Sequence, residues 1–148
     1  MNSVLGDCWS FQLQNKFEAV GERNKIKIYL KQSDFQEASP AQIWTIVDTH
    51  PDTLADYAPN SAFLLAYSQE ESVWNSLPAS YHNGGCTFAF ADGHTEFKKW
   101  ILPETRQAVT FRSFIDGARP KVAAGRRDDY RWFWLHTAER LKGFPPIE

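Results

Sequence analysis

The clearest hydrophobic pattern in the chain lies between residues 87 and 101. Residues 87–91 (TFAFA) alternate small and aromatic side chains, and residues 94–101 (HTEFKKWI) form a second strand-like run. A period of two is typical of a strand with one buried face. The Asp92-Gly93 pair between the runs favours a tight type I′ turn, which needs positive φ at both central positions. The pattern therefore predicts an antiparallel hairpin.

A two-residue loop at Asp92-Gly93 also predicts the register of this hairpin. The expected cross-strand pairs are Ala91–His94, Phe90–Thr95 and Phe88–Phe97. One face would then be apolar, with Cys86, Phe88, Phe90 and Phe97, and the other solvated, with Ala89, Ala91, His94, Glu96 and Lys98. Such a division is expected of an antiparallel sheet covered on one side.

Other segments predict further elements. Residues 26–30 (IKIYL) alternate like a strand, and residues 43–47 (IWTIV) read as a strand buried on both faces or a central one. Residues 61–67 (SAFLLAY) favour a strand over a short helix, and residues 109–115 fit either a strand or an irregular segment. Residues 128–141 begin with acidic and end with basic residues, which suits the dipole of a short helix.

These elements predict an α+β fold in a single domain spanning residues 1–148. We expect an antiparallel sheet of about four or five strands, with the hairpin at its centre and a short helix at the C-terminus. The hairpin itself should supply most of the core. The expected core residues are Ile46, Phe88, Phe90, Phe97 and Trp100.

Composition narrows the classes of partner. The net charge of -2 gives no electrostatic reason to expect nucleic acid or an anionic membrane surface. No run of about 20 apolar residues is present, so we expect no membrane contact by this segment. The two cysteines, Cys8 and Cys86, are too few for a disulfide framework. They would pair only in an oxidising compartment, and a buried free thiol at Cys86 is the alternative.

The candidate metal site is an acidic loop with one imidazole. It contains Asp48, His50, Asp52 and Asp56. Carboxylates suit calcium or magnesium, and the imidazole would suit a transition metal. The alternative is a structural turn in which the Asp side chains bond the local backbone. If a cation binds at all, we expect it at this loop rather than at His82 or Asp92.

His82 precedes a flexible Asn-Gly-Gly turn and stands ten residues before Asp92. A strand of about five residues spans roughly 17 Å. We therefore expect His82 and Asp92 at opposite ends of the hairpin, where Asp92-Gly93 sets the turn. His82 should bond a neighbouring carbonyl or carboxylate instead.

Four stretches together resemble a known family. They are His82 with nine residues before Asp92-Gly93, the flanking LPASYHNGG and FAFADGH, VDTHPD at residues 47–52, and DDYRW at residues 128–132. This combination resembles the prepilin-type processing-associated H-X9-DG domain of bacterial pilin-like proteins. His82, Asp92 and Gly93 are the positions that match the family motif.

The resemblance implies a pilin-like or pseudopilin globular head, a structural and non-enzymatic subunit of a type II secretion or type IV pilus-like assembly. Such a head is periplasmic or at the cell surface, anchored in the inner membrane by an N-terminal helix through which it contacts other pilin-like subunits. This chain lacks that helix and its cleavage site, so we expect Met1 to be an internal start. Some heads of this kind hold calcium, which makes calcium the expected ion if one binds.

Two other function classes stay open on the residues alone. Exposed tryptophans could form a glycan-binding surface, although core positions are the commoner outcome for this residue. The candidates are Trp44, Trp74, Trp100, Trp132 and Trp134. A metal-dependent hydrolase at the Asp48, His50 and Asp52 loop is the other class. A nucleophilic Cys86 with His94 as its base is not expected, because the predicted register places them on opposite faces.

Overall fold

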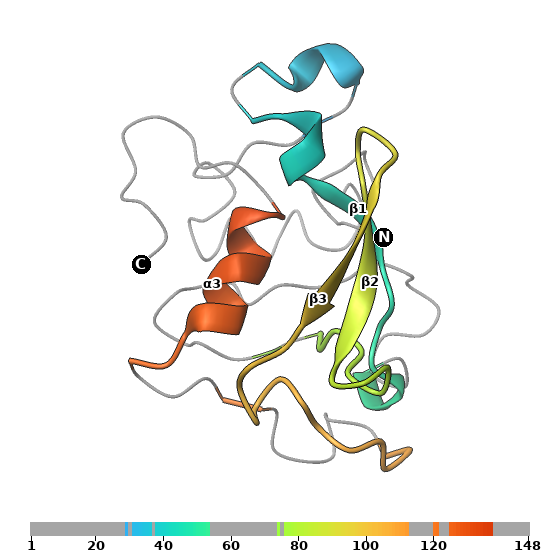
Figure 1. Cartoon of the computed structure of the whole chain (residues 1–148), viewed down its shortest axis with the longest axis vertical. Coiled ribbons are helices and arrows are strands. Elements are labelled where there is room, and N and C mark those ends of the chain that lie inside the picture. The colour runs from blue at the N-terminus through green and yellow to red at the C-terminus, as the bar shows by residue number, and fades with distance from the viewer. Residues whose placement is uncertain are drawn as a thin grey trace, which may run out of the picture.

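The computed structural model describes residues 29, 31–36, 38–53, 74, 76–112, 120–121 and 125–137. These residues form a three-stranded antiparallel sheet and a short C-terminal helix, an α+β arrangement in which strand predominates (Figure 1). The sheet order is β1 (Trp44–Val47), β2 (Gly85–Phe90), β3 (Thr95–Lys99), and the helix is α3 (Asp128–Leu135). Two short 3-10 turns, η2 (Gln32–Asp34) and η3 (Pro40–Gln42), precede β1.

The predicted hairpin is confirmed, but its loop has three residues instead of two. Gly93 N donates to Phe90 O at 3.0 Å, and Phe90 N donates to His94 O at 2.9 Å. Gly93 has φ of 94°, whereas Ala91 and Asp92 have negative φ, so the type I′ prediction is wrong. A left-handed glycine after a turn of this kind is the common three-residue hairpin loop. The carboxylate of Asp92 accepts the His94 N–H at 3.1 Å and stabilises this loop.

The type I′ geometry occurs instead just before β2. Asn83 and Gly84 have φ of 51° and 78°, and Gly85 N donates to His82 O at 3.0 Å. Asn-Gly is the preferred pair for such a turn because both residues tolerate positive φ. This turn reverses the chain directly into β2.

The longer loop shifts the register of β3 by one residue. Thr87 faces Phe97 and Phe88 faces Glu96, so the predicted Phe88–Phe97 pair is wrong. A shift of one residue moves every side chain of a strand to the other face. Phe97 is therefore 48% exposed on the outer face and is not a core residue.

Gly85 explains why Phe97 is nevertheless well placed. A Cβ atom added to Gly85 would lie 2.2 Å from Lys98 O and 2.8 Å from the Phe97 ring. The ring thus covers the backbone of Gly85 on the neighbouring strand, an arrangement known to stabilise glycines in sheets.

Strand β1 differs from its prediction as a strand buried on both faces. Within the described part of the sheet it is an edge strand, paired only with β2. The pairing shifts between Trp44 and Ile46, so that an extra residue bulges out. Ile46 consequently lies 61% exposed on the outer face, and its place in the predicted core is wrong.

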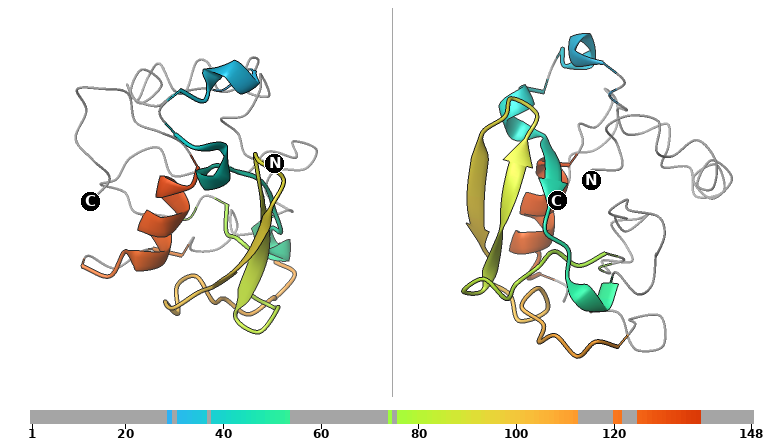
Figure 2. Two further views of the ribbon diagram at one scale, coloured as in Figure 1. Left: turned by 45° about the horizontal axis from the view of Figure 1, so that its top comes forward. Right: turned by 90° about the vertical axis from the view of Figure 1, so that its right-hand side faces the viewer.

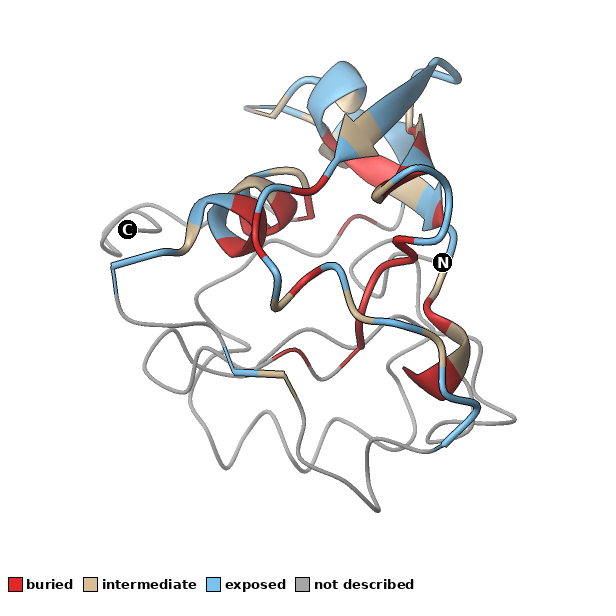
Figure 3. Ribbon diagram, turned by 60° about the horizontal axis from the view of Figure 1, so that its bottom comes forward, coloured by how far each residue is buried: buried red, intermediate tan, exposed pale blue. Residues whose placement is uncertain are grey.

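The core lies between the inner face of the sheet and α3. In both views of Figure 2 the helix lies on one side of the sheet, and no described element covers the other side. Phe88 is the centre of this core, with ring centroids of Trp132 at 5.1 Å, Trp100 at 5.9 Å and Phe133 at 5.9 Å. The predictions that Phe88, Phe90 and Trp100 are buried are confirmed. Strand β3 is exposed along most of its length (Figure 3).

The predicted C-terminal helix is confirmed in position but ends earlier, at Leu135. Residues 138–141 lie outside the described residues. The Trp44 indole N–H donates to the Thr137 hydroxyl at 2.9 Å, and that hydroxyl donates to Phe133 O at 2.7 Å. These two bonds connect β1 to the end of the helix.

Several predictions fall wholly or partly outside the described residues. The expected strand at 61–67 does so entirely, and of the expected strand at 26–30 only Tyr29 is described. In the 109–115 segment, residues 109–112 form no strand. Among the residues that the structure describes, no helix is long and apolar enough to cross a membrane.

Candidate functional site

His82 and Asp92 lie at opposite ends of β2, as the strand length predicts. His82 belongs to the turn before the strand, and Asp92 to the loop after it. Each forms an Asp–His pair, but with a different residue: Asp48 for His82 and His94 for Asp92. The two ends of the motif therefore do not form one joint site.

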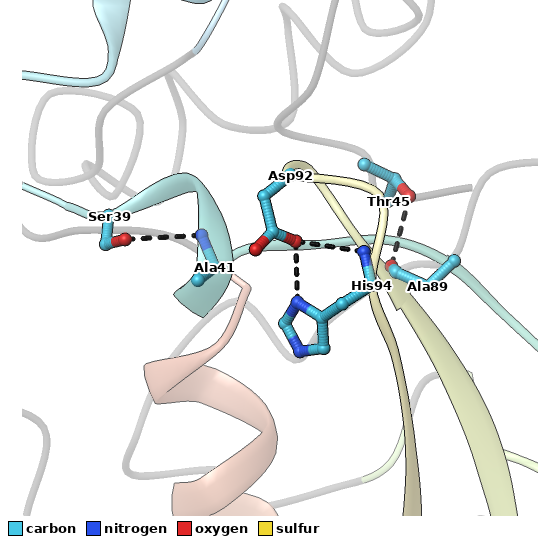
Figure 4. Close-up of polar contacts among 6 residues, drawn as sticks. All are labelled: Ser39, Ala41, Thr45, Ala89, Asp92 and His94. Carbon is cyan, nitrogen blue, oxygen red and sulfur yellow. Dashed lines mark hydrogen bonds and ion pairs between the residues drawn. The ribbon is translucent and has the colours of Figure 1, made fainter.

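The Asp92–His94 pair lies at the tip of the hairpin (Figure 4). Asp92 Oδ1 and His94 Nδ1 are 2.6 Å apart, and the imidazole stacks on Phe90 at 4.4 Å between centroids. An ionised carboxylate only accepts, so Nδ1 carries the proton in this contact. The hydrogen bonds from the His94 side chain and backbone hold the pKa of Asp92 below its usual 3.8. The side chains of both residues are partly exposed.

Asp48 forms the second pair, at the other end of β2. Its Oδ2 accepts from the Tyr81 hydroxyl at 2.8 Å and lies 3.3 Å from His82 Nε2. The prediction that His82 bonds a carbonyl or carboxylate is confirmed. Burial, followed by the hydrogen bond and negative charge of Asp48, raises the pKa of Tyr81 to about 12. The site fastens the turn before β2 to the end of β1.

His50 is fully buried and bonds a different part of the chain. Its Nδ1 accepts from Asp52 N at 3.3 Å, so Nε2 carries the proton and donates to Gln107 O at 3.2 Å. The Ser80 hydroxyl donates to the same Gln107 oxygen at 3.1 Å. His50 and Ser80 together hold the loop after β3 against the core.

Asp52 holds the same loop three residues further on. Its carboxylate accepts from the Thr110 hydroxyl at 2.7 Å, from Thr110 N at 3.0 Å and from Phe111 N at 2.7 Å. Burial raises the pKa of Asp52, but these bonds and nearby His50 lower it further, so it lies below 3.8. The negative form is therefore the one that this environment stabilises.

The structure places the candidate metal ligands apart in function. Asp48 turns outward to Tyr81, while His50 and Asp52 bond the loop at residues 107–111. Within the described ranges, no group of three or more His, Cys, Asp or Glu residues could hold a metal ion. Asp56 lies outside those ranges, so the calcium prediction for this loop stays a prediction.

The remaining candidates lie in the core. Four of the five tryptophans proposed for a glycan surface are buried, and the fifth, Trp132, stacks on His136 at 4.2 Å. Cys86 is a free, buried thiol whose pKa burial raises to about 12, with a further contribution from Asp48. A neutral thiol of this kind is a poor nucleophile.

The sequence analysis missed the role of Asp129. This buried carboxylate accepts from Ile101 N at 3.0 Å and from Leu102 N at 2.8 Å, which fastens the start of α3 to the chain leaving β3. Its sequence signal was its place in the DDYRW stretch at 128–132, because an acidic residue in the first turn of a helix can also accept backbone N–H groups from elsewhere.

The comparisons with known proteins found nothing similar to this chain. No protein-family model, no curated protein and no solved structure matches it.

Proposed function

We propose that this chain is the globular head of a pilin-like or pseudopilin subunit, a structural and non-enzymatic part of a bacterial secretion or pilus-type assembly. In this proposal the head lies outside the inner membrane, and a preceding hydrophobic helix joins it to other pilin-like subunits. The proposal comes from the resemblance of the His82 and Asp92-Gly93 stretch to the H-X9-DG domain.

One observation supports the structural reading of that motif. His82 and Asp92 each pair with a separate residue at one end of β2, at 3.3 Å and 2.6 Å. A joint catalytic site would need these side chains within hydrogen-bond reach of one another. The separation instead suits two fastenings that hold the ends of a central strand.

The test begins with the DNA upstream of the Met1 codon. The proposal expects a prepilin cleavage site followed by about 20 apolar residues, the length that spans a bilayer. The longer protein should become shorter when it is produced together with a prepilin peptidase, and should keep its length when the cleavage site is substituted. A different domain upstream, or a start codon at Met1 with its own ribosome-binding site, would contradict the proposal.

A further inference from the structure

Phe111 is held in a conformation that is uncommon for an aromatic residue. Its φ is 56°, in the left-handed region, and its side chain is 84% exposed. Bulky residues adopt this conformation only where the surroundings impose it, and such positions cluster at binding sites. Phe111 is also the most exposed large apolar side chain among the described residues.

Buried polar groups impose this conformation on the loop. The Asp52 carboxylate accepts the N–H groups of both Thr110 and Phe111, and His50 donates to Gln107 O. Because Asp52 and His50 are buried, the backbone under Phe111 is fixed from the core. The ring is thus presented to solvent in one fixed direction.

A fixed ring suits a partner with a shaped surface. Preorganisation strengthens binding by reducing the ordering that association requires. A fluid bilayer gains little from it, and one phenyl ring is a weak membrane anchor. The geometry therefore favours a folded protein as the partner.

The chain itself carries an apolar surface of this kind. We call the outer side of the sheet the open face; Ile46, Ala89 and Phe97 lie on it, with Ile46 61% and Phe97 48% exposed. Asp48 follows two residues after Ile46 and is exposed; its recorded contacts use Oδ2, so Oδ1 can accept a donor.

We propose that Phe111 of one copy packs on the open face of a second copy. The exposed Arg112, which follows Phe111 and has no ion pair among the described residues, would then approach Asp48 of the second copy. A contact between two different surfaces repeats from copy to copy instead of closing into a dimer. This inference rests on the proposed function, because a subunit of an assembly needs a contact of that repeating kind.

The first test maps the contact directly. A photo-crosslinking residue replaces Phe111 in the purified full chain, written Phe111→p-benzoylphenylalanine, with Leu135→p-benzoylphenylalanine as the control. Leu135 is 50% exposed, on α3. Crosslinked pairs of chains joined from position 111 to peptides of β1, β2 or β3 would support the proposal. Crosslinks to other peptides, or none above the control, would overturn it.

The second test uses complementary variants in sedimentation velocity. We expect Phe111→Ala and Ile46→Asp each to weaken self-association by about tenfold or more, as loss of a central anchor does. Leu135→Ala should leave it unchanged. An equimolar mixture of the two weakened variants should form mixed pairs, because one keeps the open face and the other keeps Phe111. A wild-type chain that stays monomeric at millimolar concentration, or a mixture that stays monomeric, would overturn the inference.

These tests use the chain alone, whereas the proposed function is tested on the upstream DNA and the longer protein. A monomeric chain behind a genuine prepilin leader would therefore refute only the contact. A self-associating chain without such a leader would refute only the function.

Discussion

Asp48 and Asp52 stand four residues apart, yet their environments give them opposite roles. Asp52 is 1% exposed and accepts from backbone and hydroxyl donors of the loop at residues 107–111. Asp48 is exposed and pairs with His82 and Tyr81 at the surface. Because buried polar groups are costly when unpaired and surface ion pairs contribute little, the two substitutions should have very different effects on stability.

Asp52→Asn should destabilise the fold by about 1 to 3 kcal/mol, because an amide N–H would face the Thr110 and Phe111 donors. Urea unfolding measures this free energy. Asp128→Asn, an exposed residue in the first turn of α3, is the matched control and should cost less than about 1 kcal/mol. Equal losses in the two variants would contradict the assignment.

The stability contributed by Asp52 should also depend on pH. Its folded pKa lies below 3.8, whereas an unfolded Asp titrates near about 3.9. A depressed pKa stabilises the fold fully above the unfolded value, and this stabilisation is lost as pH falls through the folded pKa. The difference in unfolding free energy between wild type and Asp52→Asn should therefore stay constant from about pH 5 to 7 and shrink below about pH 4. A constant difference down to about pH 2 would count against this account.

His82→Ala should cost little, about 0 to 1 kcal/mol, because the His82 side chain is 62% exposed and the Asp48 side chain 43%. The larger cost that a buried, unpaired partner would cause does not apply here. Urea unfolding at low and high salt measures the effect, and the difference from wild type should diminish as salt screens the pair. A loss above about 2 kcal/mol would mean that the pair is more than a surface fastening.

At the scale of elements, the hairpin depends on two glycines for different reasons. Gly93 needs its positive φ of 94°, and a Cβ atom there would meet nothing within 4 Å. Gly85 needs the absence of a side chain, since its Cβ would lie 2.2 Å from Lys98 O on β3. One glycine serves the turn, and the other allows close approach of two strands.

Gly93→Ala should therefore cost about 1 to 2 kcal/mol, the penalty of a left-handed conformation alone. Gly85→Ala should cost more, because β3 must move away from β2 to make room. Urea unfolding gives both values, and the amide signals of β3 in NMR spectra report the movement. An order of costs with Gly93→Ala above Gly85→Ala would refute this distinction.

At the scale of the molecule, Asp129 fastens the helix to the sheet. It accepts the N–H groups of Ile101 and Leu102 where the chain leaves β3, while the Trp100 indole donates to Ala79 O at 2.8 Å nearby. The sheet and α3 are thus joined by buried hydrogen bonds as well as by the aromatic core. Such bonds specify one relative placement of elements that ring packing alone leaves less defined.

Asp129→Ala should leave two buried backbone donors unpaired and destabilise the fold by about 2 to 4 kcal/mol. Hydrogen exchange provides the sharper readout, because the amides of Ile101 and Leu102 should lose protection before those of β2. Protection that falls uniformly across the sheet, or does not fall at Ile101 and Leu102, would contradict this role.

The local pattern of the sequence was sufficient for much of the architecture. Alternation at residues 87–91 predicted β2, the acidic start of α3 predicted a C-terminal helix, and strand length alone separated His82 from Asp92. Each of these features depends on neighbours in the sequence, where periodicity and reach carry the information. The placement of Phe88, Phe90 and Trp100 in the core followed from the same alternation.

Only the tertiary structure decided the register of β3 and the partners of the buried carboxylates. The choice between a two- and a three-residue loop depends on small backbone energies at Ala91 and Asp92, and a difference of one residue sent Phe97 to the outer face. Asp52 reaches Thr110, and Asp129 reaches Ile101, across 58 and 28 positions. No periodicity links residues so far apart, because folding alone brings a carboxylate and a backbone N–H together.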